Sequence, residues 1–150
     1  MHAKHLSTTA KIPHAWEFIH DDVGYNYRLP NINAALGCAQ LEKLPTYLEQ
    51  KRLLAKKYQD IFNDLEGVSL FSEPSDCRSN YWLNILLLDQ EDIAQRDEVL
   101  KLTNTSKIMT RPAWKLMHEL QIYKPCPSME LEISKEMENR MICLPSSVKL

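Results

Sequence analysis

The segment GYNYR, residues 24 to 28, combines side chains that suit an anion. The carboxamide of Asn26 and the guanidinium of Arg28 both donate hydrogen bonds to phosphate and carboxylate oxygens. A helix is predicted to follow directly, with Asn31 as its N-cap. The first turn of a helix offers free N–H groups and the positive end of the helix dipole. The segment therefore predicts an anion-binding site.

A structural interpretation of the same segment stays open. In it, Gly24 is a turn residue, both tyrosines pack on the core, and Arg28 forms an ion pair with Asp21 or Asp22. These two aspartates could also be imagined as a general acid and a general base. Neighbouring residues in a loop usually point apart, however, so we expect a solvated pair.

Two further residue sets could bind a metal or form disulfides, but neither has the spacing that these sites need. The histidines of the first twenty residues are separated by 3, 9 and 6 positions: His2, His5, His14 and His20. The four cysteines contain no C-x-x-C pair: Cys38, Cys77, Cys126 and Cys143. We expect loop histidines without a metal, and reduced thiols in a cytoplasmic protein.

The composition is that of an ordinary globular domain. The chain has 150 residues, a net charge of -2, 44% hydrophobic and 25% charged residues. A charge so close to zero argues against a nucleic-acid partner. The longest apolar run, ILLL at residues 85 to 88, is far shorter than the ~20 residues of a membrane span. The first residues also lack an apolar secretory signal, so we expect a cytoplasmic protein without a membrane partner.

The elements that must position the GYNYR segment follow from periodicity and turn residues. A helix over residues 31 to 44 carries Ile32 and Leu36 on one face, and a second helix, starting at Pro45, runs to about residue 65. Strands are expected at 68–71, 81–88 and 107–111, and helices at 90–104 and 134–141. A helical turn is expected within 114–120, and a loop at 123–129.

This order predicts an α+β fold, in which a long helix pair accompanies a small sheet covered by helices. Residues 1 to 22 read as an irregular N-terminal arm, because they are polar and lack a periodic apolar pattern. Residues 23 to 150 read as one compact small domain.

A family resemblance is carried by long stretches of the sequence. GYNYRLPNINAALGCAQLEKL at residues 24 to 44 closely resembles the segment that opens the C-terminal part of the DegT/DnrJ/StrS sugar aminotransferases. AKHLSTTAKIPHAWEFIHDDVGYNYR, TRPAWKLMHEL and RMICLPSS resemble further family segments. The family consists of pyridoxal-phosphate enzymes of the aspartate-aminotransferase fold, and the nearest resemblance is to members that act on nucleotide-linked 4-keto sugars.

The resemblance implies roles for four residues. Asn26 would approach the phosphate of the cofactor bound by the neighbouring subunit of a homodimer. Arg28 would contact the same phosphate or the diphosphate of the nucleotide-sugar substrate. His118 matches a histidine near the sugar in several members, and Tyr123 lies close to it in the sequence.

The resemblance also implies what these 150 residues do not supply. In the family, the large domain contributes the Schiff-base lysine, the aspartate that pairs with the pyridine nitrogen, and the stacked aromatic residue. Lys4 and Lys11 do not stand in the context of that lysine, so no catalytic residue is predicted. The implied protein is a truncated aminotransferase that is inactive and without bound cofactor by itself. The alternative is a free-standing interaction module that keeps the small-domain fold.

Overall fold

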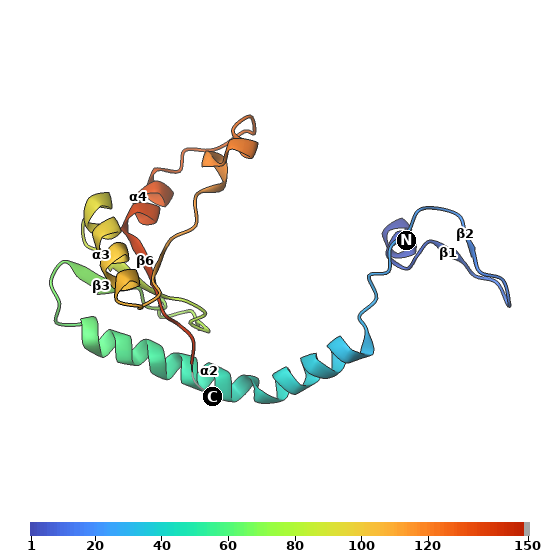
Figure 1. Ribbon diagram of the computed structural model, residues 1–150, viewed down its shortest axis with the longest axis horizontal. Helices are drawn as coiled ribbons and strands as arrows, with labels where there is room; N and C mark the ends of the chain where they lie inside the picture. Colours follow the sequence, from blue (N-terminus) through green and yellow to red (C-terminus); the bar gives the residue numbers. More distant parts are fainter. Residues whose placement is uncertain (149–150) are drawn as a thin grey trace. The chain divides into compact units, whose positions relative to one another are not determined.

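The computed structural model describes residues 1 to 148, and its contacts divide into two compact units, Met1–Leu44 and Pro45–Leu150 (Figure 1). The division differs from the predicted boundary at residue 22. The predicted boundary separates an N-terminal arm from the small domain of a full-length enzyme, and it stays a prediction.

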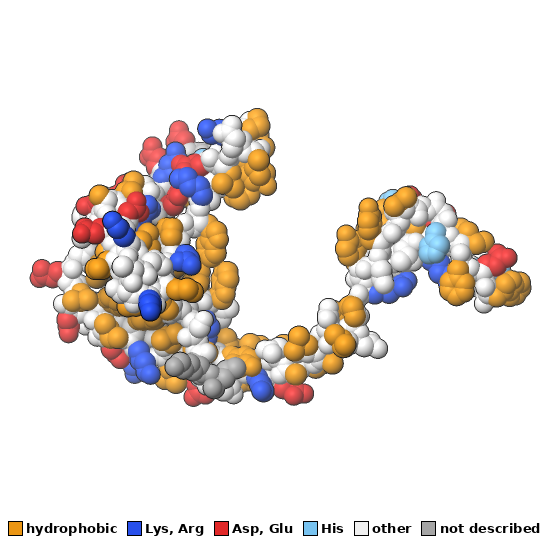
Figure 2. Space-filling view, viewed as in Figure 1, with side chains coloured by type: hydrophobic (Ala, Val, Ile, Leu, Met, Phe, Trp, Pro, Cys, Tyr) orange, Lys and Arg blue, Asp and Glu red, His pale blue; other side chains and the backbone are white. Residues whose placement is uncertain are grey.

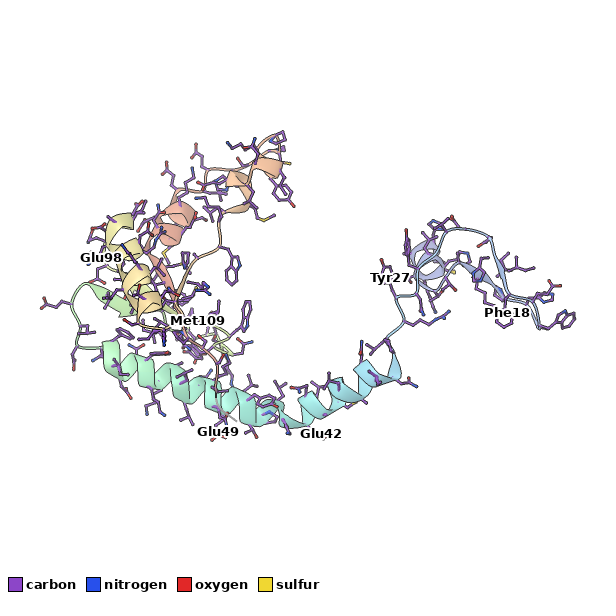
Figure 3. All side chains as sticks on the ribbon, viewed as in Figure 1. Phe18, Tyr27, Glu42, Glu49, Glu98 and Met109 are labelled. Atoms are coloured by element: carbon purple, nitrogen blue, oxygen red, sulfur yellow. The ribbon has the colours of Figure 1, made fainter. Side chains whose placement is uncertain are left out.

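The first unit begins with a short helix and a hairpin. Helix α1 (His2–Ser7) is followed by the two-residue strands β1 (Lys11–Ile12) and β2 (Ile19–His20), which pair antiparallel. Residues 1 to 22 were predicted to be irregular, and this is wrong because they contain a short helix and a hairpin. Phe18 lies near the tip of the hairpin (Figure 3).

Backbone hydrogen bonds tie α1 to the segment before the long helix. The N–H of Tyr25 donates to the carbonyl of Leu6 at 2.7 Å, and the N–H of Tyr27 donates to that of Ser7 at 2.9 Å. Thr8 and Asn26 form an isolated antiparallel bridge. The GYNYR segment is therefore held along the end of α1 by its main chain.

Helix α2 (Asn31–Phe62) is one continuous helix, so the predicted pair of helices is wrong at this point. Pro45 lies inside the helix rather than in the first turn of a second one. Proline has no N–H to donate to the carbonyl four residues earlier, and the boundary between the two units falls at this residue. Asn31 is the first helical residue, and the carbonyl of Pro30 accepts the N–H of Ala34.

The second unit is built on a four-stranded antiparallel sheet in the order β3-β4-β6-β5. Its strands are β3 (Val68–Leu70), β4 (Asn84–Leu88), β5 (Arg111–Pro112) and β6 (Met141–Leu144). Strand β6 pairs with β4 on one side and with β5 on the other. The last strand in the sequence therefore occupies an interior position.

Helices α3 (Ile93–Thr105) and α4 (Glu132–Arg140) accompany this sheet (Figure 1). The core contains Leu86, Leu88 and Ile142, and Phe62 of α2 and Val99 of α3 pack against them. The predicted α+β fold class, a small sheet with helices, is confirmed.

Several element boundaries differ from the prediction. The strand expected over 81–88 begins at Asn84, and the strand expected over 107–111 is only Arg111–Pro112, because Lys107 has a left-handed backbone with φ of 64°. The helical turn expected within 114–120 appears as two short 3-10 helices, η1 (Met117–Glu119) and η2 (Gln121–Tyr123). Across residues 1 to 148, no helix combines the length and the apolar character that crossing a bilayer requires.

Candidate functional site

Asn26 and Arg28 lie together in the first unit and present unused donors. The carboxamide oxygen of Asn26 accepts the N–H of Arg28 at 3.3 Å, and Arg28 Nη2 donates to the carbonyl of Thr8 at 3.2 Å. Within residues 1 to 148, no acceptor pairs with Nδ2 of Asn26 or with Nε and Nη1 of Arg28. A carboxamide and a guanidinium with free N–H groups can together hold an oxyanion.

Two parts of the structural interpretation of this segment are wrong. Asp21 pairs with His5 rather than with Arg28, and the hydrogen bond from His5 lowers the pKa of Asp21. Asp22 accepts the N–H of Val23. Tyr25 and Tyr27 stack on each other with ring centroids 5.9 Å apart and are exposed rather than packed on a core (Figure 3).

Gly24 has a role that neither interpretation included. A Cβ at this position would come within 2.4 Å of the carbonyl carbon of Thr9 and 2.5 Å of the nitrogen of Ala10. Glycine is therefore needed because another part of the main chain passes directly against it, rather than because of a turn.

Three of the four N-terminal histidines make separate contacts. His5 bonds to Asp21, His20 donates to the carbonyl of Thr9 at 2.6 Å, and His14 accepts the N–H of Glu17. In the described part of the chain, no three His, Cys, Asp or Glu side chains gather in a way that could hold a metal ion.

The other two predicted residues lie in the second unit, where they line one pocket. His118 and Tyr123 come from η1 and η2, and the pocket has a volume of about 350 Å³. The loop before α4 completes it with Cys126, Pro127 and Ser128. This pocket combines an imidazole, a phenol, a thiol and a hydroxyl with apolar walls, which is the kind of lining that small polar ligands use.

Two ion pairs of Lys115 link η1 to α4 beside this pocket. Lys115 donates to Glu138 of α4 at 3.1 Å and contacts Glu119 at 2.5 Å, and Glu138 is almost fully buried. The hydrogen bonds that Lys115 donates to Glu119 and Glu138 raise the pKa of Lys115, and the one to Glu119 lowers the pKa of Glu119. Sequence reasoning missed Lys115 and Glu138, because 23 residues separate them and no spacing rule connects them.

Comparisons with known proteins identify the class of this chain. The profile of the DegT/DnrJ/EryC1/StrS aminotransferase family matches residues 2–150. The chain belongs to this family. The family resemblance predicted from the sequence is thus confirmed.

Relatives and solved structures agree with the profile. A Bacillus subtilis protein, EpsN, whose name describes a pyridoxal phosphate-dependent aminotransferase, is 34% identical over 148 residues, which are 96% of this chain and 37% of EpsN. GDP-perosamine synthase of Vibrio cholerae is 33% identical over 130 residues, 85% of this chain and 35% of the synthase. The fold matches Helicobacter pylori PseC, an aminotransferase involved in the biosynthesis of pseudoaminic acid, with a TM-score of 0.82 at 22% identity, over 95% of this chain and 39% of PseC. The chain therefore spans less than two fifths of each of these proteins.

Proposed function

We propose that this chain forms the C-terminal part of a pyridoxal-phosphate-dependent aminotransferase for a 4-keto nucleotide sugar. The observation that carries the proposal is the family match over residues 2–150. The descriptions of the relatives favour the same substrate class, because one is a GDP-perosamine synthase and PseC is an aminotransferase involved in the biosynthesis of pseudoaminic acid. The activity of the whole enzyme requires groups that this chain does not contribute.

In this proposal, Asn26 and Arg28 hold the cofactor phosphate of a second subunit. Their free Nδ2, Nε and Nη1 atoms are donors of the type that phosphate oxygens accept, and the neighbouring Asp21 is hydrogen-bonded to His5 rather than to Arg28. When bound, pyridoxal phosphate acts as the electron sink that lets an amino group move between donor and sugar. The residues of this chain bind and orient, and His118 and Tyr123 face the sugar.

Covalent attachment of the cofactor is not expected from these residues. Lys4 and Lys11 are the lysines that precede the GYNYR segment, and Lys11 Nζ lies over the ring of Phe18, 3.9 Å from its centroid. We therefore propose that the anchoring lysine belongs to a part of the enzyme outside these 150 residues, and that the chain alone is inactive.

The test is to titrate the purified chain with pyridoxal phosphate and record its absorbance before and after borohydride reduction. We expect the purified chain to carry no bound cofactor and no lysine to be fixed by reduction; added pyridoxal phosphate should contact the chain only reversibly, and Asn26→Ala and Arg28→Gln should weaken this contact several-fold. Asn63→Ala is the control, because Asn63 is exposed and lies outside the GYNYR segment. A stoichiometric adduct at one lysine, together with amino transfer, would contradict the inactive-chain proposal. Absence of any phosphate-dependent binding would contradict the role of Asn26.

A second candidate function, an interaction module, has one observation in its favour. The face of α2 predicted to be apolar is exposed in the first unit, where Ile32 and Leu36 are both more than 60% accessible. Figure 2 shows hydrophobic side chains at the surface of this unit. Such a surface favours a partner, and the homodimer implied by the family supplies one. Sedimentation equilibrium tests it: a strictly monomeric chain at high concentration would exclude both the module and the homodimer.

A further inference from the structure

The second unit has a groove between α2 and the edge strand β3, with a volume of about 690 Å³. Ala55 of α2 and Leu70 of β3 line it and are buried. Two further lining residues, Leu53 and Phe71, are apolar and about half exposed, at 54% and 51%. None of the residues that the proposed function uses lines this groove. Apolar side chains that gather in this way at a surface favour contact with a polypeptide.

Strand β3 also has a free edge at this groove. It is the last strand in the sheet order and pairs with β4 alone. The N–H of Phe71 donates to the carbonyl of Ile85, so the main-chain groups of Phe71 face β4. Because successive residues of an antiparallel strand alternate in this direction, Leu70 and Val68 direct their N–H and C=O groups away from β4. Edge strands are commonly protected by a charge or a proline, and Val68–Leu70 contain neither.

Two opposite charges flank the groove and have no partner within the chain. Arg52 is neutralised, because its Nη1 and Nη2 both donate to the carboxylate of Glu73. Glu49 and Lys56 also line the groove, and both are exposed. Neither forms an ion pair with residues 1 to 148. Glu49 projects from α2 in Figure 3. The groove therefore has one negative and one positive end.

The order of these side chains along α2 is complementary to its own reverse. Glu49, Leu53 and Lys56 occupy positions i, i+4 and i+7 of the helix and so share one face. A second α2 placed antiparallel on this face, with Leu53 against Leu53, sets each Glu49 opposite a Lys56 of the other copy. A two-fold axis produces this reciprocal pairing. A parallel copy would instead set like charges opposite each other.

We propose that this groove is an interface between two copies of the chain. The faces formed by Glu49, Leu53 and Lys56 pack antiparallel, and the contact covers the free edge of β3. Each dimer gains two Glu49–Lys56 pairs and removes two Leu53 side chains from water. The interface is separate from the homodimer of the proposed function, which uses residues of the first unit, and it does not depend on amino transfer.

The test exchanges the charges and measures association by sedimentation equilibrium. Every variant also carries Leu36→Glu, at an exposed position of the first unit, so that the homodimer of the proposed function does not contribute. In this background we expect a dimer. Glu49→Lys and Lys56→Glu should each raise its dissociation constant at least tenfold, because each change turns two attractions into two repulsions. High salt should reduce this difference.

A 1:1 mixture of these two weakened variants is the decisive sample. It should dimerise again, because one copy then carries two lysines on this face and the other carries two glutamates. The matched control is Glu98→Lys, at an exposed position of α3, which should leave the dissociation constant unchanged. Leu53→Asp should weaken association in every combination, because it places two further charges at the centre of the contact.

A mixture that is as monomeric as its two components would overturn the proposal. So would unchanged association of Leu53→Asp. A Leu36→Glu chain that stays monomeric at high concentration would also contradict it and leave the groove to another polypeptide, such as an extended strand that pairs with β3. Because all samples lack the apolar face at Leu36 and no activity is measured, failure of the proposed function would leave these results intact.

Discussion

The α-carbon of Gly24 lies directly against the peptide that joins Thr9 to Ala10, and the missing side chain is what permits the contact. Both Thr9 and Ala10 have positive φ angles, 73° and 49°, and Ala10 is fully buried. This crossing fixes the position of Asn26 two residues further on. The first functional group of the candidate site is therefore held by a contact between main chains.

We expect Gly24→Ala to disrupt the first unit, because the new methyl group would meet backbone atoms that cannot rotate away. Overpacking of this kind costs typically 1 to 3 kcal/mol. The measurement is hydrogen exchange of the Thr9 and Tyr25 amides, which should lose protection. Gly37→Ala is the matched control: nothing lies within 4 Å of its added Cβ, and it should stabilise α2 by about 0.5 to 1 kcal/mol. Equal effects of the two variants would contradict this role of Gly24.

The pKa of Glu73 should make the second unit sensitive to acid. Hydrogen bonds from Arg52 and from the N–H of Ser79 lower it from 4.5 to about 2. A carboxylate with a lowered folded-state pKa contributes stability above its unfolded value, and this contribution is lost as the pH falls from about 4.5 towards 2. Urea unfolding across this range should show the loss in the wild type and a flatter dependence in Glu73→Gln.

Glu98→Gln serves as the control for this experiment, because Glu98 lies on the exposed side of α3 (Figure 3). It should keep the acid dependence of the wild type. A pH profile of Glu73→Gln identical to that of the wild type would exclude the Arg52 and Glu73 pair as its source.

Ser146 should be among the most sensitive small residues of the second unit. Its hydroxyl oxygen accepts the main-chain N–H of Asn84 at 2.8 Å and the Nδ2 of Asn84 at 3.2 Å, and both residues are buried. Oδ1 of Asn84 has no partner within residues 1 to 148. Ser146→Ala leaves both donors unsatisfied, so we expect a loss of about 1 to 3 kcal/mol in the free energy of unfolding. Ser147→Ala should change it by less than about 0.5 kcal/mol.

Three of the four cysteines should react quickly with a thiol reagent, and the fourth should react slowly. Cys38, Cys77 and Cys126 are exposed, whereas Cys143 lies in the interior strand β6, and burial raises the pKa of its thiol. Since the thiolate is the reactive form, we expect three fast thiols in the native chain and the fourth only after unfolding. Cys126→Ser should reduce the number of quickly reacting thiols to two. Four equally fast thiols would mean that β6 opens readily.

The sequence predicted what depends on local pattern. The run from Ile85 to Leu88 is apolar on both faces and rich in branched residues, and it forms the central strand β4. The segment from Ser134 has the amphipathic spacing of a helix and lies in α4. The segment 24 to 44 also predicts Asn26 and Arg28 as phosphate ligands, and this assignment stays a prediction.

Features that depend on tertiary contacts could not be predicted in this way. Pro45 predicts a helix boundary by its chemistry, yet the helix continues through it. Strand β6 is only four residues long, between Arg140 and Pro145, and becomes recognisable once its partners β4 and β5 are known. A cavity lined by Arg111 and Trp114 forms where residues of β5, β6 and Leu83 lie close together, and no spacing in the sequence predicts that they do.

The interior position of β6 also governs how the second unit is made. Strands β3 and β4 can form a hairpin while the chain is still being synthesised, but β5 has no neighbour in the sheet until Met141–Leu144 leave the ribosome. Until then one edge of β4 offers unpaired main-chain groups to any passing strand. The second unit therefore completes its sheet only after Met141–Leu144 have been synthesised, and the order of synthesis leaves a partly formed sheet open to pairing with other chains until then.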